Sequence, residues 1–366
     1  MTQLSSDKII LTAGGTGGHI YPAEALAVEL QKRNYQVMFF TDQRGLGNYQ
    51  GILKQIPNQT IYSGSIIGKS ILTKFISLIK LAFGTIQAGF YLLKNRPAVV
   101  VGFGGYASFP TALSALILRI PLIIHEQNSV MSRTNRLLAR FATRTAQSFR
   151  KTKNTPSSAK EFLCGMPIRE AISQLYFQER DWKTQNSFSL IVLGGSQGAK
   201  ILGKIVPKAI SSLSPDKQKK LIIYQQCRKG EEDNIKSLYK NTSCKCIVSS
   251  FFNNMPELYQ KSSLIISRAG ASSTYEIAAA GIPSILIPLP TAADNHQYYN
   301  AKELSNSKGA ILVNQSDFSS EFLASKLNEY FEHPEILKEL SANTKACAIT
   351  DAQIRLADEI EKFIKK

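Results

Sequence analysis

The feature that most constrains the fold of this chain is a recurring pattern in which a short apolar run ends in small residues and a helical stretch follows. The apolar runs have the length and composition of buried strands. They lie at residues 8–13, 36–41, 98–102, 121–125 and 141–148, and again at 188–193, 220–225, 246–250, 264–267 and 284–288. Since strands that alternate with helices pair in parallel, the sequence predicts an α/β fold with two doubly wound parallel sheets.

The two sets of strands suggest two domains, for which 366 residues are sufficient. The segment 161–169 places Gly165 and Pro167 between the sets, so we expect the boundary there. We predict an N-terminal domain at residues 1–165 and a C-terminal domain at 166–345. No further strand follows residue 334, and we expect a last helix at about 346–366 to pack back on the first domain.

The net charge of +17 is unevenly distributed. Residues 1–165 hold 19 Lys and Arg against 6 Asp and Glu, whereas the rest of the chain holds 25 against 21. A basic half attracts nucleic acid, anionic lipid or a polyanionic substrate. Because aromatic and basic residues are not interleaved as in nucleic-acid-binding proteins, we expect no nucleic acid partner.

The cysteines and the N-terminus indicate a cytoplasmic protein. Five cysteines are scattered, and the one close pair, Cys244 and Cys246, has no second ligand pair at metal-binding spacing. We therefore expect reduced cysteines and no bound metal. The polar residues 1–8 run directly into a strand and do not resemble a secretory signal.

Residues 66–93 form a basic amphipathic segment. Its apolar side chains recur at helical spacing from Phe75 to Phe90, and lysines, among them Lys69, Lys74 and Lys80, accompany them. Lys80 and Gln87 make a membrane-spanning helix a poor interpretation. Two interpretations remain: a helix that lies in an anionic membrane surface, or a core helix that covers the sheet.

A glycine-rich loop, Gly14–Gly18, leads from the first strand to the first helix, which we expect at about 22–32. A dinucleotide fingerprint would need a third glycine where Ile20 stands, although Asp42 after the second strand fits that interpretation. His19 lies at the end of the loop, where ligands bind in parallel sheets. It is a candidate general base, with a capping or core histidine as the alternative.

Two later strands end in similar polar segments. The turn at 102–106 carries Tyr106, and His125 precedes Glu126 and Asn128. Because carboxyl ends of parallel strands lie at one edge of a sheet, we expect these groups and His19 to converge on a pocket for a phosphorylated or polyhydroxylated molecule.

The segment 265–283 predicts a site for a nucleoside diphosphate. An apolar strand runs through Arg268 into Gly270, and a helix opens at Ala271 with Glu276 in its second turn. N–H groups at a helix start suit a diphosphate, and a carboxylate can accept both ribose hydroxyls. The alternative is a Ser/Thr-capped helix with a solvated Glu276. Arg169 or Arg268 could neutralise the phosphates, which would make a metal unnecessary.

These motifs, in this order and approximate spacing over nearly the whole chain, resemble those of the MurG family, the peptidoglycan UDP-GlcNAc transferases that act on lipid I. The resemblance implies a GT-B architecture with two Rossmann-like domains and an active cleft between them. It also implies inverting transfer without a metal or another cofactor.

The resemblance assigns substrate-binding roles residue by residue. Phe252 stands where the family often has an aliphatic residue at the uracil, and His296 where it often has a glutamine. The matched positions are Thr16, Gly17, Gly18, Asn128, Arg169, Ser196, Phe252, Ala271, Ser272, Ser273, Thr274, Tyr275, Glu276 and Gln297.

We therefore expect a glycosyltransferase that moves GlcNAc from UDP-GlcNAc to the MurNAc 4-hydroxyl of lipid I, at the cytoplasmic face of the plasma membrane as a peripheral enzyme. His19 is the first candidate for the base, and Glu126 is the second. The alternatives are a UDP-GlcNAc epimerase of similar shape, which would use the donor site without a lipid acceptor, and another lipid-directed UDP-sugar transferase of the same fold.

Overall fold

The computed structural model describes residues 7–46, 51–64, 71–180, 187–195 and 200–364. The chain forms two compact units. The first unit comprises residues 1–169 and 349–366, and the second comprises 170–348. The division after Arg169 lies four residues beyond the expected position, because the segment that contains Gly165 and Pro167 still belongs to the first unit.

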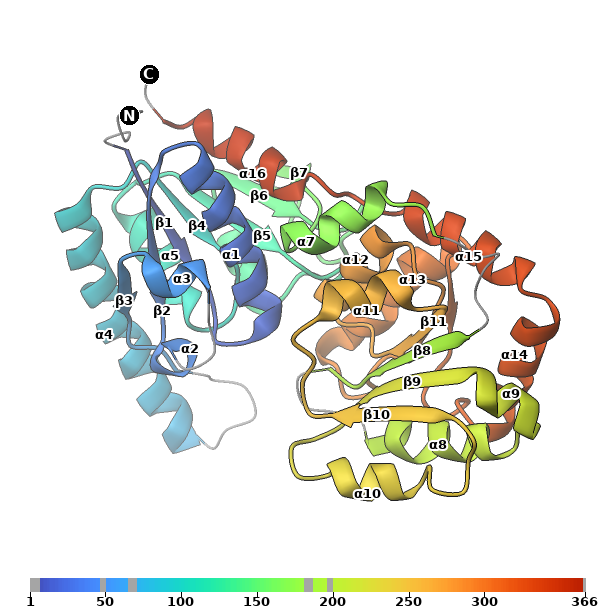
Figure 1. Cartoon of the computed structure of the whole chain (residues 1–366). Helices are drawn as coiled ribbons and strands as arrows, with labels where there is room; N and C mark the ends of the chain where they lie inside the picture. Colours follow the sequence, from blue (N-terminus) through green and yellow to red (C-terminus); the bar gives the residue numbers. More distant parts are fainter. Residues whose placement is uncertain (1–6, 47–50, 65–70, 181–186, 196–199, 365–366) are drawn as a thin grey trace. The chain divides into compact units, whose positions relative to one another are not determined.

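The first unit is built on a parallel sheet of seven strands in the order β3-β2-β1-β4-β5-β6-β7 (Figure 1). The strands are β1 (Lys8–Thr12), β2 (Gln36–Thr41), β3 (Asn58–Thr60), β4 (Val99–Gly102), β5 (Leu122–Glu126), β6 (Arg144–Gln147) and β7 (Glu161–Leu163). The helices are α1 (Gly17–Lys32), α2 (Gln43–Leu46), α3 (Ile52–Gln55), α4 (Ile71–Asn95), α5 (Ser108–Ile117), α6 (Arg133–Leu138) and α16 (Ala352–Glu361).

Helices cover both faces of this sheet. On one face Ile10 and Val100 pack with Ala88 and Leu92 of α4 and with Ala112 of α5. Because side chains alternate along a strand, the neighbours of Ile10 in β1 point to the opposite face, where α1 lies. Helix α16 packs against α1 there. The C-terminal helix is thus part of the first unit.

Ion pairs connect α16 to this unit. Arg33, at the end of α1, pairs with Asp358 at 2.7 Å and with Glu361 at 3.2 Å, and Arg144 of β6 pairs with Glu359 at 2.7 Å. Glu359 is nearly buried, so water screens its ion pair with Arg144 less than it screens the pairs of Arg33 with Asp358 and Glu361.

The second unit is built on a parallel sheet of six strands in the order β10-β9-β8-β11-β12-β13. The strands are β8 (Phe188–Leu193), β9 (Leu221–Gln226), β10 (Lys245–Ser249), β11 (Leu264–Ser267), β12 (Ser284–Leu286) and β13 (Ala310–Leu312). The helices are α7 (Glu170–Ser173), η1 (Gln174–Phe177), α8 (Lys200–Ser211), α9 (Pro215–Lys220), α10 (Glu232–Ser237), α11 (Met255–Lys261), α12 (Ala271–Ala280), η2 (Ala293–Asn295), α13 (His296–Asn306), α14 (Ser320–Glu332) and α15 (Glu335–Ala346).

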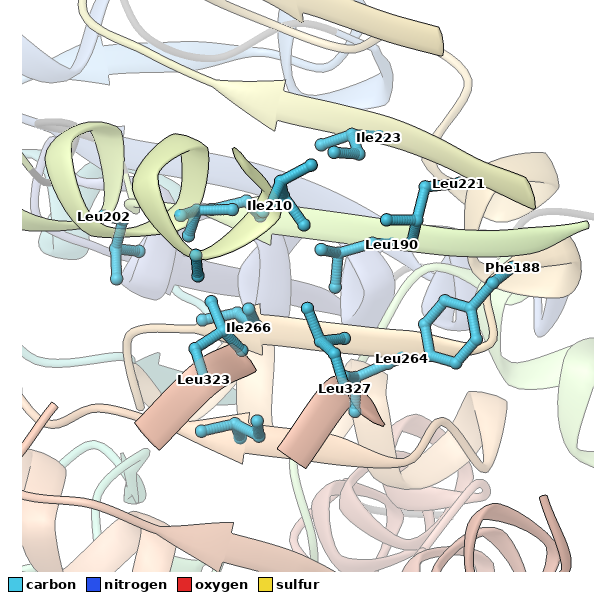
Figure 2. Packing of buried hydrophobic residues seen from close by; sticks show 14 of the residues in the cluster. Phe188, Leu190, Leu202, Ile210, Leu221, Ile223, Leu264, Ile266, Leu323 and Leu327 are labelled. Carbon is cyan, nitrogen blue, oxygen red and sulfur yellow. The ribbon is translucent and has the colours of Figure 1, made fainter. Parts of the chain in front are cut away.

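The core of the second unit lies between its sheet and α8 and α14. Figure 2 shows Leu190 and Ile266 of the sheet beside Ile210 of α8 and Leu323 of α14. All four side chains are fully buried. All six residues of β8 are buried and five of them are apolar, as its central position in a sheet with two covered faces requires.

Three strands were not expected from the sequence. They are β3, β7 and β13, each of three residues and each at the edge of a sheet. β3 and β7 contain polar residues, and β13, although apolar, has only three residues, so none of the three strands has the apolar run of four to eight residues that indicates a buried strand. The first helix also differs: it begins at Gly17, so the end of the glycine loop and His19 already belong to α1 and Pro22 lies within it.

The apolar stripe of α4 faces away from the core. Phe75, Ile79, Phe83, Ile86 and Phe90 are 54–73% exposed. The buried face of α4, which packs against α5, is formed by Ser77, Leu81, Gly84, Ala88 and Leu92. The core-helix interpretation of the stripe is therefore wrong. Among the described residues, Phe75–Asn95 is long and apolar enough to span a membrane by length and composition alone.

Candidate active site

In each sheet the strand order reverses at one place, where the first strand of the unit meets a strand from its second half. In the first unit β1 lies beside β4, and in the second β8 lies beside β11. Loops leave such a pair of strands in opposite directions, which opens a crevice at their carboxyl ends. The glycine loop before α1 and the turn before α12 both lie at these positions.

In the first unit the two glycine-rich turns pack directly on each other. The Gly14 N–H donates to the Gly104 carbonyl at 3.1 Å. A Cβ on Gly105 would lie 3.0 Å from the Gly14 Cα, and Gly105 has a φ of +79°. Glycine is therefore required at Gly14 and Gly105 by chain packing.

The His19 imidazole lies across these turns. Its Nδ1, Cδ2 and Cε1 atoms lie 3.5–3.6 Å from the positions that a Cβ would take on Gly14, Gly104 and Gly105 respectively. Three ring atoms thus face three different glycines. A Cβ at any of these positions would be in van der Waals contact with the ring, so the imidazole lies close to both turns.

Thr16 and Gly18 flank His19 on the exposed side of the loop. The Thr16 Oγ1 lies 2.8 Å from the His19 Nδ1. A Cβ on Gly18 would meet no atom within 4 Å, so at Gly18 the chain leaves open space. A Cβ on Gly17 would approach the Tyr21 ring to 3.0 Å. Only Gly18, of these glycines, has the surroundings expected where a ligand approaches the backbone.

Glu126 is fully buried, and its carboxylate accepts hydrogen bonds from four N–H donors. Oε1 accepts from the backbone and side-chain amides of Asn128 at 3.0 and 3.4 Å. Oε2 accepts from the Ser132 N–H at 2.9 Å and from the Asn135 Nδ2 at 2.8 Å. Burial raises the pKa of Glu126, and these hydrogen bonds oppose the rise. The carboxylate holds the loop that carries Asn128, and both of its oxygens are engaged within the fold, so this geometry argues against Glu126 as the base.

His125 is also fully buried, and one of its tautomers is favoured. A carbonyl oxygen can only accept a hydrogen bond, so the Nε2–H donates to the Gly165 carbonyl at 3.0 Å. Burial lowers the pKa of His125 to about 4, although the bond to Gly165 opposes this. His125 is a neutral structural residue at physiological pH, while half-buried Tyr106 and Asn128 lie nearer the surface of the same sheet edge.

The Asp42 carboxylate, the feature that fitted a dinucleotide site, makes hydrogen bonds with neighbouring residues of its own unit. The carboxylate accepts from Arg44 at 2.6 Å, from the Gly45 N–H at 3.0 Å and from the Ser63 hydroxyl at 3.2 Å. A dinucleotide ribose would need these same oxygens. The dinucleotide interpretation is therefore not supported at Asp42.

In the second unit α12 begins as the donor site requires. Gly270 is the N-cap, and among the described residues no side chain caps the first turn and no atom lies within 4 Å of the position that a Cβ on Gly270 would take. The Ser272 Oγ is buried and has no hydrogen-bond partner among the described residues. At the other end Gly281, with a φ of +59°, closes the helix through its N–H to the Ala278 carbonyl.

Glu276 is 8% exposed, in contrast to the solvated residue of the alternative interpretation. The Tyr259 hydroxyl, from α11, donates to its Oε2 at 3.0 Å. This hydrogen bond fixes the carboxylate near the start of α12. Residues Ala271, Ser273, Thr274 and Tyr275 complete the first turns, and the Thr274 hydroxyl donates back to the Gly270 carbonyl at 3.0 Å.

The Arg268 guanidinium makes three hydrogen bonds within the second unit. Its NH1 donates to the carbonyls of Ile287 and Pro288, each at 3.1 Å, and its NH2 donates to the Gln315 Oε1 at 2.6 Å. The side chain is thus committed to the loops after β12 and β13. These loops and α8 line a pocket of about 360 Å³, formed by Ile201, Pro288, Pro290, Asn295, Tyr298, Asn314, Gln315 and Ser316.

The remaining candidates are placed as follows. Gln297 accepts from the Leu289 N–H through its Oε1 at 2.9 Å, which directs its amide hydrogens elsewhere. The Phe252 ring is nearly buried against Tyr224, with ring centroids 6.3 Å apart. The Arg169 guanidinium lies over the Tyr21 ring at 5.5 Å. Ser196 lies outside the described residues.

Sequence reasoning missed the residues that hold the candidates in place. Asn135 binds Glu126, and Tyr259 binds Glu276. Asn135 lies in the first turn of α6 behind the N-cap Ser132 and could have been noticed as a buried amide in a short helix. Tyr259 gives no signal, since its partner lies seventeen positions away in another helix.

The comparisons with known proteins cover both units. Residues 9–147 match the glycosyltransferase family 28 N-terminal domain, and residues 189–356 match the glycosyltransferase family 28 C-terminal domain. A protein of Rhodospirillum rubrum is 39% identical over 96% of this chain and 90% of its own length. A protein of Rickettsia bellii is 40% identical over 92% of this chain and 94% of its own length. Both are named UDP-N-acetylglucosamine–N-acetylmuramyl-(pentapeptide) pyrophosphoryl-undecaprenol N-acetylglucosamine transferase.

Solved structures agree with this assignment. MurG of Acinetobacter baumannii has a TM-score of 0.78 and 30% identity over 97% of this chain and 99% of its own. A UDP-GlcNAc 2-epimerase of Neisseria meningitidis has a TM-score of 0.67 but 16% identity over 97% of this chain and all of its own, which shows a shared fold alone. The chain has the GT-B fold and belongs to glycosyltransferase family 28, within the MurG family of N-acetylglucosamine transferases.

Proposed function

We propose that this protein transfers GlcNAc from UDP-GlcNAc to the 4-hydroxyl of the MurNAc unit of undecaprenyl-diphospho-MurNAc-pentapeptide, lipid I, and forms lipid II for peptidoglycan synthesis. The names of its relatives support this substrate pair. The observation that carries the proposal is the start of α12, where uncapped N–H groups stand next to a buried carboxylate held by Tyr259.

On the donor side, the N–H groups at the start of α12 would bind the diphosphate, and Glu276 would accept the ribose hydroxyls. As the glycosidic bond to the phosphate breaks, negative charge grows on the leaving UDP. The positive end of the helix dipole stabilises that charge more than it stabilises the bound donor, which lowers the barrier. Gln297 would donate its amide hydrogens to the sugar hydroxyls, and Arg169 would add a positive charge for a phosphate.

On the acceptor side, His19 would take the proton of the 4-hydroxyl as the oxygen attacks the anomeric carbon. The new C–O bond forms on the face opposite the departing UDP, so the configuration at the anomeric carbon inverts. Tyr106, Asn128 and the open backbone at Gly18 would position the acceptor. We favour His19 over Glu126 because the Glu126 oxygens already accept four hydrogen bonds within the fold.

We expect this transfer to need no metal and no other cofactor. The charge on the leaving diphosphate can be balanced by helix N–H groups and by Arg169. In the part of the chain that the structure describes, no group of three or more His, Cys, Asp or Glu side chains is placed to hold a metal ion.

The test of the proposed reaction is direct. The protein is incubated with UDP-GlcNAc and a short-chain lipid I analogue, and the products are separated. We expect UDP and the β-linked disaccharide in equal amounts. Conversion of UDP-GlcNAc to its C2 epimer without acceptor would instead support the epimerase alternative, and absence of disaccharide with an intact acceptor would refute the proposal.

We also propose that α4 holds the enzyme on the cytoplasmic face of the plasma membrane as a peripheral protein. Its exposed stripe carries aromatic and branched aliphatic side chains, and Lys80 and Lys94 are exposed beside it. An interfacial helix of this kind buries its apolar face at the boundary of headgroups and acyl chains, while its lysines meet anionic lipid.

Co-sedimentation with vesicles tests the role of α4. We expect Phe83→Ser combined with Ile86→Ser to reduce binding to anionic vesicles, while turnover on a water-soluble acceptor analogue persists. Phe177→Ser is the matched control, since Phe177 is equally exposed but belongs to the second unit. High salt should weaken binding only in part, because screening acts on the lysines and not on apolar burial. Equal loss in the control variant would refute a specific role for α4.

A further inference from the structure

Thr16 has an unusual position for an N-cap residue. A threonine there ordinarily accepts a hydrogen bond from a backbone N–H of the first turn. The Thr16 side chain makes no such bond. The His19 N–H instead donates to the Thr16 backbone carbonyl at 2.9 Å, and the Thr16 hydroxyl lies 2.8 Å from the His19 Nδ1. The hydroxyl is therefore hydrogen-bonded to the imidazole and does not cap the helix.

The direction of this hydrogen bond decides which nitrogen of His19 can act as a base. A neutral imidazole carries one proton, on either Nδ1 or Nε2. If the Thr16 hydroxyl donates, Nδ1 provides the lone pair and the proton stays on Nε2, so no lone pair remains for a substrate. If the hydroxyl accepts, the proton lies on Nδ1 and Nε2 carries the lone pair.

We propose that Thr16 is a positioning residue that accepts a hydrogen bond from the Nδ1–H of His19 and so keeps the Nε2 lone pair available for the acceptor hydroxyl. This inference rests on the proposed function, in which His19 is the base. When Nε2 takes the substrate proton, the ring becomes a cation, and the Nδ1–H···Oγ1 bond becomes charge-assisted. Thr16 therefore contributes more to the transition state than to the ground state.

Two other histidines provide internal references for an experiment. The His125 Nε2 lies 3.0 Å from the Gly165 carbonyl, which fixes its proton on Nε2. The His296 Nδ1 lies 2.8 Å from the Ala293 carbonyl, which fixes its proton on Nδ1. Since the chain holds four histidines, each can be assigned by substitution.

The experiment is long-range ¹H–¹⁵N correlation spectroscopy of the full chain labelled with ¹⁵N-histidine, at a pH where the imidazoles are neutral. We expect the wild-type His19 signal to show the pattern of His296 and not that of His125. In Thr16→Val the preference should be lost, and in Thr16→Ser it should return. A wild-type His19 with its proton on Nε2 would overturn the inference, whatever the variants do.

Kinetics with UDP-GlcNAc and the lipid I analogue provide the second measurement. Loss of a charge-assisted hydrogen bond in Thr16→Val should lower kcat by roughly 10–100-fold, with the KM for UDP-GlcNAc unchanged. Thr16→Ser should recover most of this loss. Wild-type kcat in Thr16→Val would overturn the inference while leaving the proposed reaction intact. If the wild-type protein forms no disaccharide, the proposed function itself fails, and the spectrum still reports the tautomer.

Discussion

Replacement of Glu126 by glutamine separates a structural role from a catalytic one. The substitution keeps the shape of the side chain but exchanges one acceptor oxygen for an NH₂ donor. Each Glu126 oxygen accepts from two N–H groups. In either orientation of the glutamine, its NH₂ group would therefore face two N–H donors in place of an acceptor. A buried donor without an acceptor costs about 1–3 kcal/mol of stability. Because the half-buried Asn128 side chain can turn to water, we expect the free energy of unfolding to fall by roughly 2–4 kcal/mol in total.

The loss should be local, so the assay must report on individual segments. We would measure amide hydrogen exchange by mass spectrometry in peptides that cover residues 127–135. Exchange should accelerate there in Glu126→Gln, while the affinity of the second unit for UDP, measured by calorimetry, should not change. Glu161→Gln is the matched control on the same sheet: Glu161 is exposed and accepts from the Gln147 side chain, which a glutamine oxygen can replace. We expect that control to stay within about 0.5 kcal/mol of the wild type.

The result that refutes this reasoning is a Glu126→Gln protein with wild-type exchange and wild-type thermal stability whose turnover falls by roughly 10²–10⁴-fold, the range of a general base. Glu126 would then act on the substrate. A protein that loses protection at residues 127–135 in proportion to its loss of turnover supports the structural role, because the acceptor side chain Asn128 lies in that segment.

Further outcomes are expected at other positions. Glu276→Ala should weaken UDP-GlcNAc binding by about 1.5–3 kcal/mol in a calorimetric titration, as for a hydrogen bond to a charged group. Unchanged affinity would show that Glu276 is not part of the site. Tyr259→Phe is the matched control and should have a smaller effect, because it removes only the hydroxyl that donates to Glu276. His19→Ala should lower turnover by roughly 10²–10⁴-fold with UDP affinity intact. EDTA should leave activity unchanged, and loss that magnesium restores would contradict this. Because burial lowers the pKa of His125 to about 4 in the folded state, stability should be lost as pH falls from about 6.5 to about 4, and urea unfolding of His125→Asn should lack that decline.

The inner framework of both sheets could be predicted because each strand carries its own evidence. The strands at Phe188–Leu193 and Leu264–Ser267 begin and end at the predicted residues. Both are buried between helices, so their apolar composition follows directly from their surroundings. The edge strands β3, β7 and β13 are specified mainly by pairing with a neighbour, which leaves little trace in three residues.

The candidate site was predictable to the level of the loop and not to the level of the atom. The motifs correctly indicated that His19 and Glu126 lie near the carboxyl ends of strands in the first sheet, and Glu276 near the carboxyl end of a strand in the second. The sequence could not indicate that Glu126 turns inward to four N–H donors while Glu276 accepts from the Tyr259 hydroxyl. Both residues are carboxylates near a strand end, and their difference arises from Asn135 and Tyr259, which only the folded chain brings to them.

The glycines illustrate this limit most clearly. Gly105 and Gly195 each follow another glycine at the end of a strand, and both have a φ of +79°. A Cβ at Gly195 would meet no atom of the described residues within 4 Å, and there its positive φ favours glycine. At Gly105 a Cβ would lie 3.0 Å from the Gly14 Cα and 3.5 Å from the His19 ring. The same Gly-Gly sequence thus forms only a turn in the second unit, whereas in the first unit it forms a turn that contacts the ring of the proposed base, His19. The difference depends on whether a second glycine turn, ninety positions away in the chain, packs against the first.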